Sequence, residues 1–279
     1  MKEKYSIKNC KKCGFLHLYP KPTEQSLKKF YEEDYHQKLT HHLHDFKKEL
    51  REQWWINQKS EEHLYFLKKF GKKTGKILDI GCGNGFFLKF MQEQGWEGLG
   101  IEISPLARKN ALTLGVKTQE DFRGLEYEKY DVIMLRFILE HLRNPLPFLK
   151  KVKKYLKTRG ILITIVPNDF NPLQLSTEKI GINKWWIRQP DHINYFNFES
   201  LTFLLQKCGY KPIHKFTDFP MEIFLLMGDN YVKNQRLGRI LHKKRMMFEK
   251  NLEWETTRKI YESFAKQGIG RSCIIYSKK

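Results

Sequence analysis

Residues 77–91 read Ile77-Leu78-Asp79-Ile80-Gly81-Cys82-Gly83-Asn84-Gly85 followed by Phe86-Phe87-Leu88-Lys89-Phe90-Met91. A short apolar run carries an acidic residue near its end, and three glycines at alternate positions follow it. The apolar residues after the glycines can continue as a buried helix. A strand, a glycine-rich turn and a helix in this order are typical of a nucleotide-binding corner, because glycine lets the backbone turn tightly and approach a ligand.

The glycine spacing narrows the class of ligand. A dinucleotide fingerprint needs its third glycine five residues after the first, but Phe86 stands there and the third glycine is Gly85. No phosphate-binding lysine follows the glycines, which excludes a P-loop. A second apolar run ends at Glu102, 23 residues after Asp79. A carboxylate at that strand end can accept hydrogen bonds from both hydroxyls of a ribose.

Four separated motifs resemble, in the right order, those of the class I S-adenosylmethionine-dependent methyltransferases. Residues 79–85 match Asp-x-Gly-x-Gly-x-Gly, and residues 130–135, 139–145 and 160–168 are similar to the family's fourth strand, its Glu-His segment and its fifth strand with a Pro-Asn end. The resemblance covers about residues 60–215. It implies an α/β, Rossmann-like fold: a mostly parallel seven-stranded sheet with an antiparallel last strand, helices on both faces, and helical additions at both ends of the chain.

The resemblance implies S-adenosylmethionine as cofactor and S-adenosylhomocysteine as product. In that family the glycine motif holds the methionine end of the cofactor and the later acidic residue holds the ribose. The matching positions here are Asp79, Gly81, Gly83, Gly85 and Glu102.

Four further residues are predicted to contact the cofactor. Ile103 follows Glu102 and can pack on the adenine face. The family's third-strand loop borders the adenine, which suggests that Asp121 accepts from the adenine amino group. Arg136 and Phe137 follow the fourth strand, where strand ends meet a ligand.

Two histidines are candidates for catalysis, and an alternative stays open for each. His141 lies in the Glu-His segment and is either a base or a residue that braces the loop. His192 is the first candidate for a general base because histidine titrates near neutral pH, and its alternative is a structural role. It lies in a long stretch, residues 168–197, that shows little regular pattern and is predicted to form a lid. Candidate substrate contacts in this lid, or ordinary apolar anchors of it, are Trp185, Trp186, Arg188 and Tyr195.

The chain is predicted to have two parts. Residues 1–60 form an N-terminal segment with a Cys-x-x-Cys pair and a helical cap, and residues 61–279 form the methyltransferase domain. A helical insertion over residues 228–268 precedes the last strand and either caps the substrate or forms a homodimer. Thr23 is predicted to cap a short helix, and a later helix is predicted to begin at Asn144-Pro145 and to end at Gly160.

No metal site is expected. Cys10 and Cys13 are one half of a zinc ribbon whose second half is absent, so a remnant turn with free thiols is preferred over zinc bound by this pair with help from His17. Four further histidines are interpreted as a solvated face and not as metal ligands: His36, His41, His42 and His44.

Composition limits the location and the partners. The chain of 279 residues has 51 lysines and arginines against 31 acidic residues, a formal net charge of +20. It has no apolar run long enough for a bilayer and no secretory signal, and its five cysteines do not suggest a disulfide scaffold. A cytoplasmic location is therefore expected. The positive charge is scattered, which favours a lysine-rich surface without a dedicated partner, with an anionic substrate as the alternative.

The predicted function is methyl transfer to an oxygen, nitrogen or carbon nucleophile of a small molecule, such as a quinone precursor, a sugar or a secondary metabolite. Methylation of RNA or protein is the alternative that the charge favours, but no added RNA-binding motif supports it. A protein that binds the cofactor without catalysis and a dehydrogenase that binds NAD are the remaining alternatives.

Overall fold

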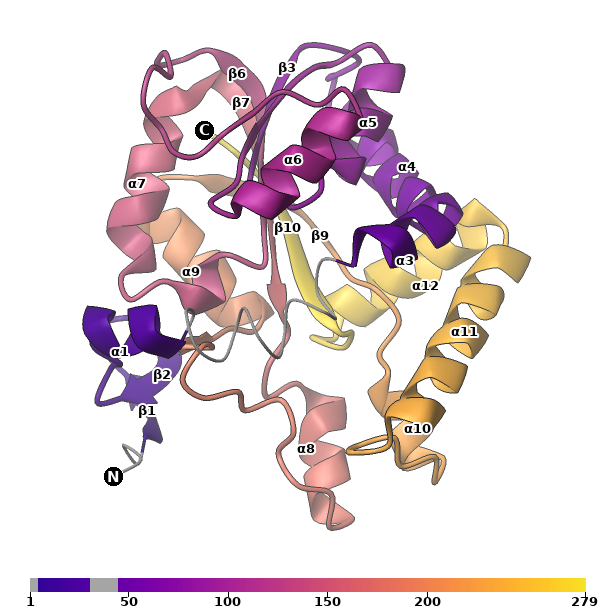
Figure 1. Ribbon diagram of the computed structural model, residues 1–279. Coiled ribbons are helices and arrows are strands. Elements are labelled where there is room, and N and C mark those ends of the chain that lie inside the picture. Colours follow the sequence, from indigo (N-terminus) through magenta and orange to yellow (C-terminus); the bar gives the residue numbers. More distant parts are fainter. Residues whose placement is uncertain (1–4, 31–44) are drawn as a thin grey trace.

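The computed structural model describes residues 5–30 and 45–279, so the histidines at positions 36, 41, 42 and 44 lie outside the described residues. Its centre is a seven-stranded sheet of order β5-β4-β3-β6-β7-β10-β9 (Figure 1). The strands are β3 (Lys76–Ile80), β4 (Glu97–Ile101), β5 (Thr118–Gln119), β6 (Tyr130–Arg136), β7 (Leu156–Pro167), β9 (Lys211–Phe216) and β10 (Ser272–Lys278). Neighbours from β5 to β7 are parallel, and β10 is antiparallel to both β7 and β9. The predicted sheet, with its antiparallel last strand, is confirmed.

Helices cover both faces of this sheet (Figure 1). The helices are α1 (Glu24–Phe30), α3 (Phe46–Arg51), α4 (Gln53–Lys69), α5 (Phe86–Glu93), α6 (Pro105–Thr113), α7 (Pro145–Tyr155), α8 (Pro172–Lys179), α9 (Phe198–Lys207), α10 (Glu222–Leu226), α11 (Gln235–Asn251) and α12 (Trp254–Lys266), with a 3₁₀ turn η2 (Leu139–His141).

Successive side chains of the central strands enter two separate apolar cores. In β6, Ile133 and Leu135 pack with α7 and α9, whereas Val132 and Met134 pack with α4, α5 and α12. A strand that is buried on both faces is apolar at every position, and this explains why residues 132–135 show no alternation of polar and apolar side chains.

The N-terminal segment forms a second, small sheet. β1 (Ser6–Cys10) and β2 (Phe15–Tyr19) make a hairpin, and β2 also pairs with the short strand β8 (Asn194–Tyr195) of the predicted lid. The predicted helix after Thr23 is confirmed as α1, and the Thr23 hydroxyl accepts from the amide of Ser26 at 3.0 Å.

Two predictions of local structure are wrong. α7 ends at Tyr155, not at Gly160, because the backbone amides of Glu128 and Lys129 bond to the carbonyls of Lys154 and Tyr155 and draw the chain into β7. The lid is also less irregular than predicted, since it contains α8. The side chain of Asn171 caps this helix by accepting from the amides of Leu173 and Gln174 at 3.0 Å.

The predicted insertion before the last strand contains α11 and α12, and α10 ends just before its predicted start at residue 228. The boundary predicted between residues 60 and 61 falls within α4, and both the division into domains and the homodimer through residues 228–268 stay predictions.

A buried polar cluster joins the insertion to α4. The carboxylate of Glu249 accepts from Trp55 Nε1 at 2.9 Å and from the Tyr261 hydroxyl at 2.8 Å, and it pairs with Lys59 Nζ at 3.1 Å.

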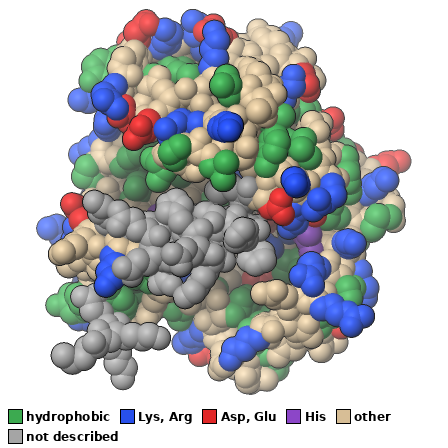
Figure 2. Space-filling view, in the orientation of Figure 1, with side chains coloured by type: hydrophobic (Ala, Val, Ile, Leu, Met, Phe, Trp, Pro, Cys, Tyr) green, Lys and Arg blue, Asp and Glu red, His purple; other side chains and the backbone are tan. Residues whose placement is uncertain are grey.

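None of the helices within residues 5–30 and 45–279 is both long and apolar enough to cross a bilayer. On the face seen in Figure 2, lysine and arginine side chains are spread from the top of the molecule to its lower edge, with acidic side chains among them.

The buried cluster around Glu249 predicts a large effect of one substitution. Glu249→Leu leaves the buried guanidinium of Arg245 (3% exposed) without the carboxylate that lies 3.9 Å away, and it leaves Lys59 with Glu62 alone (2.8 Å). We therefore expect a loss of about 3–5 kcal/mol in the free energy of unfolding, measured in urea. As a control, Glu93→Gln breaks the exposed pair with Lys89 (3.3 Å) and should change this free energy by less than about 1 kcal/mol. A loss below about 1 kcal/mol for Glu249→Leu would contradict the proposed importance of the cluster.

Candidate functional site

The turn between β3 and α5 depends on glycine at its first and last positions. Gly81 and Gly85 have φ angles of 76° and 83°, in the left-handed region that side chains disfavour. A Cβ atom at Gly81 would lie 2.4 Å from Cδ1 of Ile138, and at Gly85 it would lie 3.0 Å from Cβ of Ala111. The turn therefore packs tightly against the loop after β6 and against α6.

Glu102, just beyond the end of β4, holds this turn from the neighbouring strand. Its Oε2 accepts from the backbone amide of Gly83 at 3.0 Å, and its Oε1 accepts from the amide of Ser104 at 2.8 Å. The residue is 8% exposed. A carboxylate oxygen can accept more than one hydrogen bond, so each oxygen of Glu102 keeps a lone pair for a hydroxyl of a ligand.

Asp79 lies beside this carboxylate and is buried. Its Oδ1 has no hydrogen-bond partner among the described residues. Burial raises the pKa of Asp79 to about 6; the Arg136 guanidinium opposes this rise and the Glu102 carboxylate adds to it. The guanidinium lies 5.1 Å from the centre of the Phe87 ring, and the Arg136 Nε has no acceptor in the described part of the chain. Asp79 and Arg136 thus offer one unused acceptor and one unused donor at the ends of β3 and β6.

Three further residues predicted to contact the cofactor differ in their surroundings. Ile103 is 80% exposed and Phe137, with a φ angle of 53°, is 44% exposed, so both present apolar surface. Asp121 instead accepts from the amide and from Nε of Arg123, at 2.8 and 2.7 Å, and these bonds lower the pKa of its carboxyl. An adenine amino group would have to share Asp121 with Arg123.

Helix α3 lies against the glycine turn, a contact that no sequence motif indicated. Asn84 Nδ2 donates to Glu49 Oε2 at 2.9 Å, and the rings of Phe46 and Phe86 lie 5.6 Å apart. Asn84 Oδ1 in turn accepts from Asn110 Nδ2 at 2.9 Å. Asn84 therefore joins α3, the turn and α6.

A second group of polar side chains lies beyond the ends of β6 and β7. Atoms of Glu140, His141 and His192 that can bind a proton or a metal lie within 4.8 Å of one another. His141 Nδ1 donates to the carbonyl of Asp191 at 2.9 Å, and the rings of His141 and His192 meet edge to face at 4.9 Å. Burial raises the pKa of Glu140 well above its ordinary value.

The near-neutral pKa expected for His192 is wrong for this arrangement. Burial lowers the pKa of His192 to about 2, and the nearby His141 and Arg188 side chains add to this effect. The ring is therefore neutral across the physiological range, and it can accept a hydrogen bond much more readily than it can keep a proton.

The lid residues predicted to contact substrate lie close to one another. The rings of Trp185 and Trp186 are 4.9 Å apart, and the Phe170 ring contacts both Trp186 (5.8 Å) and Tyr195 (6.0 Å). The Tyr195 hydroxyl donates to the carbonyl of Arg188 at 3.3 Å. Trp186 and Tyr195 are buried, whereas Trp185 and Arg188 are only partly buried. The two partly buried side chains are therefore the ones that this structure leaves accessible to a substrate.

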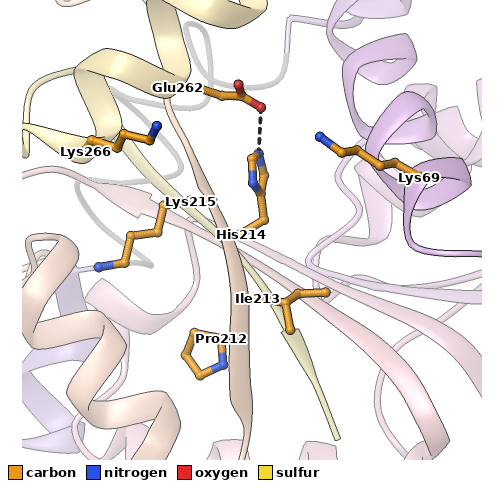
Figure 3. A pocket seen from close by; sticks show the side chains of 7 residues that line it. All are labelled: Lys69, Pro212, Ile213, His214, Lys215, Glu262 and Lys266. Atoms are coloured by element: carbon orange, nitrogen blue, oxygen red, sulfur yellow. Dashed lines mark ion pairs between the residues drawn. The ribbon is translucent and has the colours of Figure 1, made fainter.

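The hollow drawn in Figure 3 lies elsewhere, on the edge strand β9 between α4 and α12. It has a volume of about 460 Å³, and Lys69, Lys215 and Lys266 surround a His214–Glu262 pair (Nε2 to Oε1, 3.5 Å). In the sheet order β9 stands four places from β3, so this hollow does not belong to the glycine turn.

Comparisons with known proteins identify the family and the fold of the chain. A family model described as a methyltransferase domain matches residues 50–215. The ubiquinone biosynthesis O-methyltransferase of Cereibacter sphaeroides is 26% identical over 154 residues, which cover 50% of this chain and 62% of that protein. The protein of the same name from Actinobacillus pleuropneumoniae is 38% identical over 107 residues, 33% of this chain and 44% of that protein. The matched region thus spans less than two thirds of these relatives.

Solved structures show the same fold. A SAM-dependent methyltransferase from Archaeoglobus fulgidus superposes with a TM-score of 0.52 at 20% identity, covering 82% of this chain and 98% of that chain. A possible histamine N-methyltransferase from Thermotoga maritima gives 0.52 at 16% identity, covering 86% and 96%. With the family model matching more than half of its residues, the chain belongs to the methyltransferase domain family and has the fold of the SAM-dependent methyltransferases.

Proposed function

We propose that this protein binds S-adenosylmethionine at the glycine turn and transfers its methyl group to a hydroxyl of a small molecule. The observation that carries the proposal is the Glu102 carboxylate, which stands at the end of β4 and is bonded to the Gly83 amide beside the buried, unpartnered Asp79 oxygen. Family membership and the shared fold support the same conclusion.

The groups around the turn suit the parts of this cofactor. Glu102 would accept from the ribose hydroxyls, and Ile103, 80% exposed, would cover one face of the adenine. Asp79 and Arg136 would face the methionine end, which carries an ammonium, a carboxylate and a sulfonium. When bound, the cofactor supplies an electrophilic methyl group, and the protein's part is to align the acceptor with it and to exclude water. Helix α3 and the lid would serve this exclusion.

The acceptor would lie between the histidine pair and the partly buried Trp185. The neutral ring of His192 would accept a hydrogen bond from a hydroxyl and, together with His141, orient its oxygen. When this oxygen takes the methyl group its O–H bond breaks, and the proton would pass to His192 and on to solvent. The curated relatives are named as O-methyltransferases of ubiquinone biosynthesis, which supports a phenolic hydroxyl as the acceptor. The net charge of +20 supports an acceptor that also carries negative charge, although Arg188 is itself paired with the Asp191 carboxylate at 2.7 Å.

Removing either carboxylate should weaken cofactor binding while the fold survives. For Asp79→Asn and Glu102→Gln we expect the dissociation constant of S-adenosylmethionine, measured by calorimetry, to rise about 10- to 100-fold, because a hydrogen bond to a charged group contributes about 1.5–3 kcal/mol. Glu97→Gln, at the exposed start of the same strand as Glu102, is the matched control and should bind normally. Unchanged affinity in both test variants would show that the cofactor site is elsewhere, and formation of S-adenosylhomocysteine with a panel of phenols tests turnover.

Cofactor affinity should also depend on pH through Asp79. Its pKa is raised to about 6, so as pH falls through this value the carboxylate is protonated and loses its attraction for the cationic cofactor. We expect wild-type affinity to be full at pH 7.5 and to fall about tenfold at pH 5. Asp79→Asn should bind more weakly but equally at both values. A wild-type affinity that does not change between pH 5 and pH 7.5 would argue against contact between Asp79 and the cofactor.

His192 is predicted to act on the acceptor and not on the cofactor. We expect His192→Ala to lower turnover about tenfold or more while the dissociation constant of S-adenosylmethionine stays within about twofold. With saturating cofactor, the pH profile of wild-type turnover should show no inflection near pH 6.5, because His192 is neutral above its pKa of about 2. Full activity of the variant, or an inflection near pH 6.5 that the variant abolishes, would overturn this assignment.

A further inference from the structure

The N-terminal hairpin carries a cluster of soft metal-binding atoms away from the cofactor site. The two sulfurs of Cys10 and Cys13 and one ring nitrogen of His17 lie within 4.8 Å of one another. Cys10 ends β1, Cys13 stands in the turn, and His17 is in the middle of β2, so the two strands of one hairpin bring all three ligands together. Ligands this close need only a small contraction to reach bonding distance from a common ion.

The turn between the cysteines is shaped for metal binding. The amide of Cys13 points at the Cys10 sulfur, 3.4 Å away, and the amide of Gly14 donates to the Cys10 carbonyl at 2.8 Å. An amide that donates to a sulfur stabilises its thiolate form, which is the form that binds metals. Gly14 has a φ angle of 81°, and a Cβ atom there would lie 2.5 Å from the Phe203 ring of α9.

The hydrogen bond of His17 prepares its ring for a metal. His17 Nδ1 lies 2.7 Å from the carbonyl of Leu18, and a carbonyl only accepts, so Nδ1 carries the proton. Nε2 then keeps its lone pair. A backbone carbonyl that fixes the second ring nitrogen in this way is the usual partner of a metal-bound histidine. Since His17 is 7% exposed, its ring cannot turn away into solvent.

From this arrangement we propose that Cys10, Cys13 and His17 bind a zinc ion, with a water molecule as the fourth ligand. Two thiolates and one imidazole favour zinc over the hard cations, which prefer oxygen. Two thiolates also neutralise the charge of the ion. A neutral site would not repel the nearby Lys207 ammonium, which donates to the Lys12 carbonyl inside the turn at 3.1 Å.

The ion would strengthen the contact between the hairpin and the lid. β2 pairs with β8 through Leu16 and Tyr195 and through His17 and Asn194, and the Leu18 amide donates to the Ile193 carbonyl at 2.9 Å. The amide of Ile193 donates to the carbonyl of Glu140 at 2.8 Å. Strand β2, which carries His17, is thus connected to the Glu-His turn through the backbone of Ile193, which is hydrogen-bonded to both. β2 is anchored by the buried Phe15 and Leu18, whereas the outer strand β1 is mostly exposed, so the ion would add most to the order of β1 and of the turn.

Metal content tests this proposal without reference to methyl transfer. We expect the protein, purified under reducing conditions, to hold about one zinc ion per chain by mass spectrometry. Replacement by Co²⁺ should give the absorption of a tetrahedral site together with a sulfur-to-cobalt charge-transfer band. Cys10→Ser, Cys13→Ser and His17→Gln should each lower the metal content to less than about a tenth of the wild type.

Two matched controls separate this site from other metal-binding groups. Cys82→Ser removes a thiol outside the hairpin, and His141→Gln disrupts the cluster of Glu140, His141 and His192. Both should keep the zinc. A wild-type protein that holds no zinc and binds none at about 10 μM would overturn the proposal. So would zinc retained by Cys10→Ser/Cys13→Ser, or zinc lost only in His141→Gln. The charge-transfer band of the cobalt protein decides between sulfur and other ligands even if a variant does not fold.

Hydrogen exchange tests the link to the lid. Removing the metal with a chelator should speed exchange of the amides of Leu18 and Ile193 about tenfold or more, and should leave the amide of Ile133 in the central sheet unchanged. Equal protection of Leu18 and Ile193 with and without metal would show that the ion does not stabilise the lid.

Discussion

The Glu102 carboxylate links two neighbouring strand ends, and the geometry of the site depends on this link. Parallel pairing sets Asp79 opposite Gly100, so the glycine turn after β3 begins beside the end of β4. Glu102 then bonds to the Gly83 amide in that turn and to the Ser104 amide at the start of α6. A charged acceptor with two amide donors is fixed in orientation before a ligand arrives, and preorganisation of this kind lowers the cost of binding.

Segments far from the glycine turn in the sequence complete the site around this link. Helix α3 bonds to the turn through Glu49 and Asn84, and the hairpin supports the lid through β8. The tail contributes as well, because Asn168 at the end of β7 donates to the carbonyls of Gly268 and Gly270 at 2.9 Å, just before β10. The sheet therefore positions the glycine turn, and α3, the hairpin and the tail complete its surroundings.

Local sequence patterns predicted the elements that depend on interactions between residues close in the sequence. The glycine turn and the buried strands follow from glycine geometry and apolar runs, whereas the antiparallel last strand was expected from the family resemblance; all three are confirmed. The end of α7 was missed because pairing with β6, a contact distant in sequence, draws Leu156 into a strand. Helix α8 was missed although Asn171-Pro172 repeats the signal of Asn144-Pro145. In α7 the Asn144 side chain makes no capping hydrogen bond, while Asn171 makes two.

At the candidate site, too, the features that depend on contacts distant in the sequence could not be predicted. The positions of Asp79 and Glu102 at strand ends were predictable from spacing, but the burial that raises the pKa of Asp79 and lowers that of His192 was not. Those shifts arise from tertiary packing. The sequence suggested His17 only as an alternative helper of the Cys-x-x-Cys pair, and the pairing of β1 with β2 is what brings its ring close to both cysteines.

The most direct test is a crystal structure of the protein with S-adenosylhomocysteine. We predict that both ribose hydroxyls lie within hydrogen-bonding distance of Glu102, that the adenine covers Ile103 and that the amino-acid end lies near Asp79 and Arg136. A complex in which Glu102 keeps only its bonds to Gly83 and Ser104, with the nucleoside bound elsewhere, would contradict the proposed function of this turn.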